Sequence, residues 1–253
     1  MVVYGIGDLH LSSRKPKPMD IFGPAWENHQ SKIEENWRRV VGAEDIVLIP
    51  GDISWAMHYE DALADLQFLA GLPGSKVLIK GNHDYWWPGI SKLRHDAPAE
   101  LYFIQNDVLT LGNVAVTGTR LWDFPFVQWN GFVENQGLGG PEREDLPPKK
   151  GPEADDERIR HRELERLRLC LSQMPESSDY HRIVMVHFPP VGSTLEANPI
   201  TTLLAEHHVE TCLFGHLHNL RPEAEIGGAV DGVNYLCVSA DYLAFAPKPV
   251  LAA

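Results

Sequence analysis

The sequence predicts an α/β fold whose functional residues lie in the loops that follow its strands. Three short apolar segments, 2–6, 46–49 and 77–79, have the length and composition of buried strands, and helical patterns separate them. Each segment runs directly into a polar loop that carries aspartate, asparagine or histidine. In α/β proteins, binding sites form outside the carboxyl ends of the strands. We therefore expect these polar side chains to gather at one edge of a sheet.

The other predicted elements favour a pair of mixed sheets over a single parallel sheet. Apolar residues within 26–41, 63–70 and 164–174 recur at the three- and four-residue intervals of one helix face. Further short strands are predicted in the second half of the chain, at 114–117, 183–186, 211–214 and 235–238. Several of these strands have no long helix between them.

We expect a single domain over residues 1–253. A chain of 253 residues, 43% of them hydrophobic, is long enough to bury one large core. Residues 137–157 are rich in glycine, proline and charge and show no apolar periodicity. They are predicted to form an exposed loop, within an insertion near 120–157.

Composition limits the classes of partner and the compartment. Lys and Arg total 22 against 35 Asp and Glu, and the net charge of −13 opposes capture of long nucleic acids or an anionic membrane. A small phosphate ester remains compatible with this negative charge, because bound divalent cations would reverse the local field. No apolar run reaches the length of a membrane span, and three scattered cysteines without a CxxC pattern favour a reducing compartment, the cytoplasm. No pattern in the sequence specifies an oligomeric state.

Five polar motifs follow the predicted strands. They are Asp8-Leu9-His10, Gly51-Asp52, Gly81-Asn82-His83-Asp84, His187 and Gly215-His216-Leu217-His218. Each alone has an ordinary structural explanation, such as a capped turn or the start of a loop. His216 and His218 are more specific, because side chains two residues apart in an extended segment project to the same side and can serve adjacent metals.

Taken together and in this order, the motifs resemble those of the calcineurin-like metallophosphoesterase family over residues 8–218. The resemblance implies a four-layer α/β/β/α sandwich, with two mixed sheets face to face, helices outside and a dimetal site in strand-end loops. It also implies a set of ligands: one metal held by Asp8, His10 and His218, the other by Asn82, His187 and His216, with Asp52 as the bridge.

The ligand types indicate the metals and their chemistry. Imidazole nitrogens favour transition metals over Mg²⁺ or Ca²⁺, so two divalent ions are expected, Mn²⁺ first, with Fe or Zn²⁺ as alternatives. The resemblance implies hydrolysis by attack of a metal-bound hydroxide. It also implies that His83 faces the substrate phosphate as charge stabiliser or general acid, with Asp84 orienting and charging its ring. The equal alternative is that the Asp84 carboxylate only ties down the loop.

Other residues near these motifs have two interpretations each. Arg120 is expected either to bind substrate phosphate or to form an ordinary salt bridge. Several aromatic residues after the strands could stack on a base or aryl group, or belong to the core: Trp55, Trp86, Trp87, Trp122, Phe124, Phe126 and Trp129. Of the remaining histidines, only His58 lies close after a motif; the others are expected at the surface or the core edge.

We expect the reaction to be hydrolysis of a small phosphate ester, in particular a phosphodiester. A phosphomonoesterase or a nucleotide pyrophosphatase would use the same site. A non-catalytic scaffold of the same fold is the alternative from a different class. Such a scaffold should have lost ligands, whereas all seven are present here together with His83.

Overall fold

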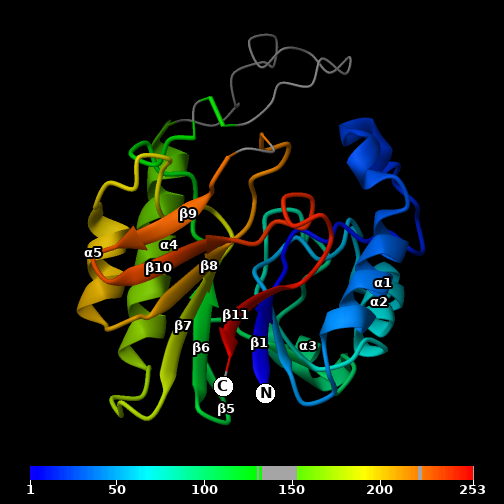
Figure 1. Ribbon diagram of the computed structural model, residues 1–253, viewed down its shortest axis with the longest axis horizontal. Helices are drawn as coiled ribbons and strands as arrows, with labels where there is room; N and C mark the ends of the chain where they lie inside the picture. Colours follow the sequence, from blue (N-terminus) through cyan, green and yellow to red (C-terminus); the bar gives the residue numbers. More distant parts are fainter. Residues whose placement is uncertain (130, 133–152, 222–223, 253) are drawn as a thin grey trace.

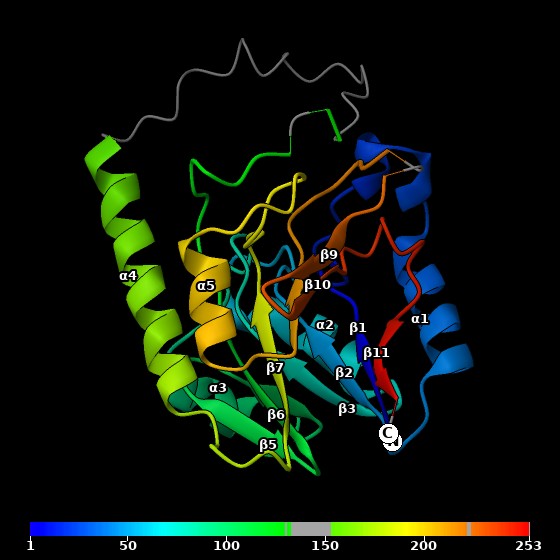
Figure 2. The same cartoon turned by 60° about the vertical axis from the view of Figure 1, so that its left-hand side comes forward.

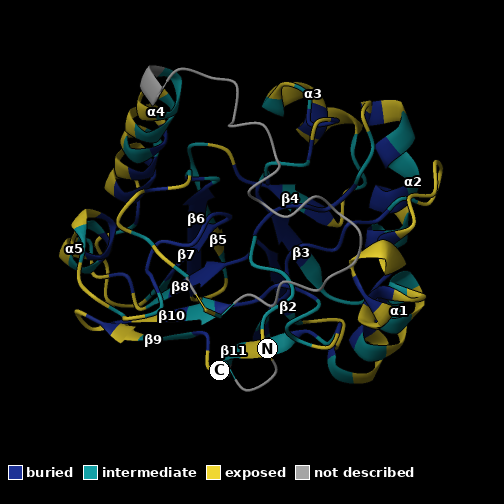
Figure 3. Ribbon diagram, turned by 90° about the horizontal axis from the view of Figure 1, so that it is seen from above, coloured by how far each residue is buried: buried dark blue, intermediate teal, exposed yellow. Residues whose placement is uncertain are grey.

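The computed structural model describes residues 1–129, 131–132, 153–221 and 224–252. Two β-sheets pack face to face, and helices cover the outer face of each (Figure 1). The four-layer α/β/β/α arrangement implied by the resemblance is therefore confirmed. Figure 3 shows the same layering from above, with buried residues on the strands and exposed residues on the outer sides of the helices.

The first sheet is built mainly from parallel strands of the first half of the chain. Its order is β11 (Lys248–Ala252), β1 (Val2–Gly5), β2 (Ile46–Ile49), β3 (Ser75–Leu78) and β4 (Leu101–Phe103). β1 to β4 run parallel, and β11 joins β1 antiparallel. The chain thus ends its last strand beside its first one.

The second sheet is also mixed. Its order is β5 (Val108–Leu111), β6 (Val114–Thr119), β7 (His181–Val186), β8 (Thr211–Phe214), β10 (Val233–Cys237) and β9 (Gly227–Val230). β6, β7, β8 and β10 are parallel, while β5 and β9 are antiparallel at the edges. All seven predicted strands exist, with ends displaced by up to two residues; β4, β5, β9 and β11 were not predicted.

Five α-helices lie outside the sheets in the described residues. α1 (His29–Val40), α2 (Tyr59–Ala70) and α3 (Ile90–Asp96) pack on the first sheet, and α4 (Glu153–Ser172) and α5 (Pro199–Glu206) on the second. Two short 3₁₀ turns, Met19–Phe22 and Pro24–Trp26, precede α1. Trp26, predicted with the first helix, therefore lies just before it.

The predicted loop at 137–157 is too long at its carboxyl end. α4 begins at Glu153, so the last five of these residues are helical. The first turns of a solvated helix need no apolar residue, and glutamate, alanine and arginine are strong helix formers. The absence of apolar periodicity was therefore a poor indicator of a loop here. Residues 137–152 of this predicted loop lie outside the described residues.

The core between the sheets fixes how their strand ends meet. Val3, Leu48 and Val77 of the first sheet pack against Val116 and Met185 of the second, all fully buried or nearly so. Beyond this core, the backbone N–H of Gly7 donates to the carbonyl of Val238 at 2.7 Å. The carboxyl ends of the parallel strands of both sheets consequently lie at the same end of the molecule (Figure 2).

Two further predictions concern the environment of the chain. Cys170, Cys212 and Cys237 are buried, and none of them forms a disulfide. Among the described residues, no helix combines the length and the apolar character that crossing a bilayer requires. Location in the cytoplasm stays a prediction.

Candidate metal centre

The predicted ligands lie in tight turns with an unusual backbone conformation. Four of them have positive φ angles: Asp8 (55°), His10 (46°), Asp52 (53°) and His216 (73°). This left-handed region is uncommon for residues other than glycine, although asparagine, aspartate and histidine adopt it more often than most. Such conformations persist only where the surroundings fix them, and they cluster at functional sites.

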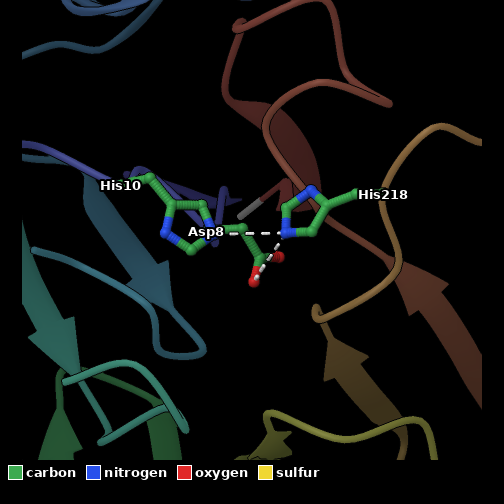
Figure 4. A group of neighbouring side chains, drawn as sticks. All are labelled: Asp8, His10 and His218. Atoms are coloured by element: carbon green, nitrogen blue, oxygen red, sulfur yellow. Dashed lines mark hydrogen bonds and ion pairs between the residues drawn. The ribbon is translucent and has the colours of Figure 1, made fainter. Parts of the chain in front are cut away.

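Asp8, His10 and His218 form the first ligand group (Figure 4). Their donor atoms all lie within 4.8 Å of one another. The Nε2 atoms of His10 and His218 face each other at 3.2 Å, and His218 Nε2 is 3.9 Å from Asp8 Oδ1. Two ring nitrogens and a carboxylate oxygen thus converge from different elements. These are the three residues that the resemblance assigned to one metal.

The second group gathers around His187 at the end of β7. Asp8, Asp52 and His187 also place donor atoms within 4.8 Å of one another. His187 Nε2 lies 2.5 Å from Asn82 Oδ1, and His216 Nδ1 lies 3.1 Å from the same oxygen. The three residues expected to hold the other metal are therefore in mutual contact.

Asp52 lies between the two groups. Its Oδ2 atom is 3.7 Å from His10 Nε2 and 3.5 Å from His187 Nε2. Its Oδ1 atom accepts a hydrogen bond from the backbone N–H of His83 at 2.8 Å, which holds the carboxylate in place. One carboxylate oxygen thus faces both ligand groups, as a bridging residue requires.

The electrostatics of the cluster fit bound cations. Burial, with a contribution from Asp52, raises the pKa of Asp8 to about 7, and burial lowers the pKa of His187 to about 3. Burial also lowers the pKa of His10 well below its usual value. Neutral imidazoles keep a lone pair for a metal, while buried carboxylates need a counter-charge. Divalent cations would supply that charge, and the mixed nitrogen and oxygen donor set suits transition metals.

Two motif glycines allow the carboxylates to come this close. A Cβ atom at Gly215 would lie 2.4 Å from Asp8 Oδ2, and one at Gly81 would lie 2.1 Å from Asp52 Oδ1. Both distances are far below van der Waals contact. Glycine is therefore required at each position by the space that a ligand carboxylate occupies.

The contacts of Asp84 favour the alternative interpretation, in which its carboxylate ties down the loop. Its buried carboxylate accepts hydrogen bonds from the backbone N–H groups of Asp52 and Ile53, each at 2.9 Å, and of Gly81 at 2.8 Å. Among the described residues, no group hydrogen-bonds the Nδ1 atom of His83. The backbone donors of the neighbouring loop capture the Asp84 carboxylate instead. Asp84 therefore ties the loops after β2 and β3 together, which was the alternative interpretation.

His83 lies at the open rim of the cluster. About a third of its side chain, 33%, is exposed, while the side chains of Asp8, Asp52 and His187 are fully buried or nearly so. Its Nε2 atom is 4.0 Å from Asp52 Oδ2, and its ring lies 4.3 Å from that of Trp55. Trp55 also stacks on His10 at 4.8 Å. A group bound at the cluster would meet His83 and Trp55 on this side.

Asp241 is a site residue that the sequence reasoning missed. Its Oδ1 atom lies 3.0 Å from His218 Nδ1, and its Oδ2 atom accepts the backbone N–H of Asn219 at 3.0 Å. A carboxylate on the far nitrogen of a ligand histidine fixes the ring and its tautomer. Asp241 follows β10. Its position after a strand, like that of the predicted ligands, could have identified it from the sequence.

The other candidates separate into site and core residues. Arg120 lies 3.9 Å from Glu163 and over the ring of Trp122, and its carbonyl accepts the backbone N–H of His187. His58 is exposed before α2 and belongs to neither ligand group. Of the aromatic residues, Trp86, Trp87 and Phe124 are buried.

Known proteins resemble this chain in sequence and in structure. A family model described as calcineurin-like phosphoesterase matches residues 1–220. The Gene 66 protein of Mycobacterium phage D29 is 34% identical over 136 residues, and that of Mycobacterium phage L5 is 28% identical over 129 residues. These matches cover 49% and 47% of this chain but 64% and 61% of the phage proteins, less than two thirds of their length. A crystal structure of a protein of unknown function from Aquifex aeolicus aligns over 98% of this chain and 94% of its own, with 14% identity and a TM-score of 0.46.

The first prediction concerns the glycine beside Asp8. Gly215→Ala should reduce the bound metal by at least about half, because the new Cβ would displace the Asp8 carboxylate from the ligand cluster. Elemental analysis after gel filtration measures the loss. Gly89→Ala is the matched control, since a Cβ there meets nothing within 4 Å. Unchanged metal content in a folded Gly215→Ala protein would contradict the prediction.

Proposed function

This chain belongs to the calcineurin-like phosphoesterase family, and from that premise we propose that it hydrolyses small phosphate esters, in particular phosphodiesters, with two divalent metal ions. Metal-dependent hydrolysis of phosphoesters is the activity of the family. The observation that carries the proposal is the position of Asp52, whose Oδ2 atom faces His10 at 3.7 Å and His187 at 3.5 Å. A single carboxylate between two ligand groups suits a pair of ions better than one ion.

The resemblance divides the proposed ligands between the two ions. Asp8, His10 and His218 would hold one ion, Asn82, His187 and His216 would hold the other, and Asp52 would be shared between them. When bound, the ions supply positive charge to the phosphate and activate water. The neutral amide of Asn82 leaves that charge less compensated than a carboxylate would. We favour Mn²⁺, with Fe or Zn²⁺ as alternatives, because five of the ligands or bridging groups are nitrogen or neutral donors.

His83 acts on the substrate, not on the metals, in this proposal. Its ring lies at the rim, and its partly exposed side chain can reach a phosphate oxygen or the leaving group. As an imidazolium it would stabilise negative charge, and as an acid it would protonate a leaving alkoxide. Asp84 has no part in this step, because its carboxylate is occupied by the backbone of the loops.

The preference for small phosphodiesters rests on charge and on aromatic side chains near the cluster. The net charge of −13 repels a polymer that continues beyond the metals, whereas a compact ester meets mainly the ions. The Trp55 ring lies 4.3 Å from that of His83, and Phe188 lies 4.1 Å from the ring of His216 and contacts Trp122. These rings offer apolar surface for the alcohol side of a diester. Stacking of this kind contributes about 1–3 kcal/mol per base.

The metal stoichiometry tests the centre directly. We expect about two transition-metal ions per chain, and we expect Asp52→Ala to weaken both sites because the bridging carboxylate is shared. Inductively coupled plasma mass spectrometry measures the metal content. Asp96→Ala, at an exposed aspartate of α3, should bind metal like the unmodified protein. The centre is disproved if the protein binds no metal and added Mn²⁺ gives no activity.

His83→Ala separates metal binding from catalysis. The variant should keep both metals and lose roughly 10²-fold or more in kcat, the usual effect of removing a general acid or charge stabiliser. If His83 donates the proton, the loss should be smaller for a nitrophenyl ester than for an alkyl ester. Equal losses would identify a charge stabiliser. His95→Ala, at an exposed histidine, is the control.

A substrate panel tests the proposed ester class. We expect kcat/KM to be highest for a bis-aryl diester or a cyclic nucleotide, lower for an aryl monoester and lowest for single-stranded DNA. All substrates should be compared at the same Mn²⁺ and salt concentrations. Preference for the monoester or the DNA over every small diester by more than about tenfold would exclude this class while leaving the metal centre intact.

A further inference from the structure

A polar cavity opens beside the metal centre, between α4 and the loops that end β3, β4 and β6. Its volume is about 320 Å³, at the lower end of the range for small-ligand sites. Lys80, Arg120, Arg162 and Arg166 supply its positive charges, and Glu163 is its one acidic residue. In Figure 3, α4 and α3 lie on the same side of the molecule, at the top of the view.

The cavity adjoins the predicted ligands through two of its residues. Lys80 follows β3 and precedes the motif that contains Asn82 by one residue. The carbonyl of Arg120 accepts the backbone N–H groups of His187 at 3.2 Å and of Phe188 at 3.0 Å. The wall of the cavity is thus continuous with the loops that carry two ligands of the second group.

Glu163 does not balance the positive charge around it. One of its oxygens, Oε1, lies 2.7 Å from Arg166, 3.4 Å from Arg162 and 3.9 Å from Arg120. The other oxygen accepts a hydrogen bond from Thr119 at 2.9 Å. A single carboxylate neutralises one guanidinium, so two of the three arginine charges remain. A purely structural ion pair would need only one of these arginines.

Lys80 adds a further positive charge to the cavity. Within the part of the chain that the structure describes, its ammonium group makes no hydrogen bond and no ion pair. The side chain is half-buried, so water does not solvate it fully. In a chain with a net charge of −13, such a surplus of cations in one cavity is unusual. This surplus of positive charge indicates that an anionic ligand binds in the cavity.

We propose that this cavity is a binding site for a phosphate group, separate from the metal ions. Guanidinium groups match the geometry of phosphate and bind it through paired hydrogen bonds, and Lys80 contributes a point charge. Three surplus positive charges suit a dianion better than a single carboxylate. The phosphate comes either from a second phosphoryl group of the substrate or from free inorganic phosphate.

Equilibrium dialysis with radiolabelled inorganic phosphate tests the site on the metal-loaded protein. We expect two phosphates per chain, one at the metals and one in the cavity. Replacing Arg162 and Arg166 together by glutamine should weaken the cavity site by roughly tenfold or more and leave the phosphate at the metals. Lys80→Gln, on a different element, should have the same effect. Arg168→Gln, on α4 but outside the cavity, is the matched control.

The same measurement separates this proposal from the proposed function. Asp52→Ala should remove the phosphate at the metals and keep the one in the cavity, because Asp52 does not line it. Phosphate binding that depends on Asp52 alone, and is unchanged in the folded Lys80 and arginine variants, overturns the cavity site. A different result would be that the unmodified protein binds one phosphate, which the Lys80 and arginine variants lose and Asp52→Ala keeps. That result supports the cavity site and contradicts the metal centre.

Kinetics then identify the source of the phosphate. We would compare kcat/KM for a dinucleotide phosphodiester with and without a terminal 5′-phosphate in the unmodified protein and the double arginine variant. A selective loss of roughly tenfold or more with the 5′-phosphorylated diester assigns the site to a second phosphoryl group of the substrate. This outcome rests on the proposed function. An unchanged ratio, together with weaker binding of inorganic phosphate, assigns the site to free phosphate.

Discussion

The contact between Asp8 and the backbone of the 215–216 turn is the interaction on which the candidate metal centre depends. Both carboxylate oxygens lie 3.0 Å from the backbone nitrogen of His216, which donates to them across the two sheets. Gly215 leaves room for this approach. Asp8 belongs to the first sheet, whereas His216 and His218 follow a strand of the second. Each sheet alone carries an incomplete set of ligands. The centre therefore assembles only when the two sheets pack against each other.

The sequence was sufficient to predict which side chains gather at this end of the molecule, because they obey a local rule. Asp8, Asp52, Asn82 and His187 each follow an apolar strand, and the carboxyl ends of parallel strands converge without further information. Sheet order is a different matter. β11 pairs with β1 although the whole chain separates them, and no local pattern encodes that partnership. The edge strands are short and partly exposed, so their apolar alternation is weak.

The contacts of Asp84 were not predictable for a similar reason. Proximity in sequence suggested His83 as its partner, whereas its carboxylate is bound by backbone groups about thirty residues earlier, the N–H groups of Asp52 and Ile53. A sequence does not indicate which backbone N–H group will donate to a given side chain, because every residue except proline has an N–H group. The cationic cavity was hidden for the same reason. Arg120 and Arg166 meet only because α4 packs on β6, and the overall charge of the chain gives no indication of it.

The positive φ angles of Asp8, His10, Asp52 and His216 also bear on how such a protein can change over generations. Chemistry demands carboxylate and imidazole at these positions, and the backbone favours a small set of residues that includes the same types. Most single replacements therefore lose a ligand and add backbone strain together. Substitution by asparagine or glycine avoids the second penalty. Descendants that have abandoned catalysis should carry those two residues at these turns more often than alanine or valine.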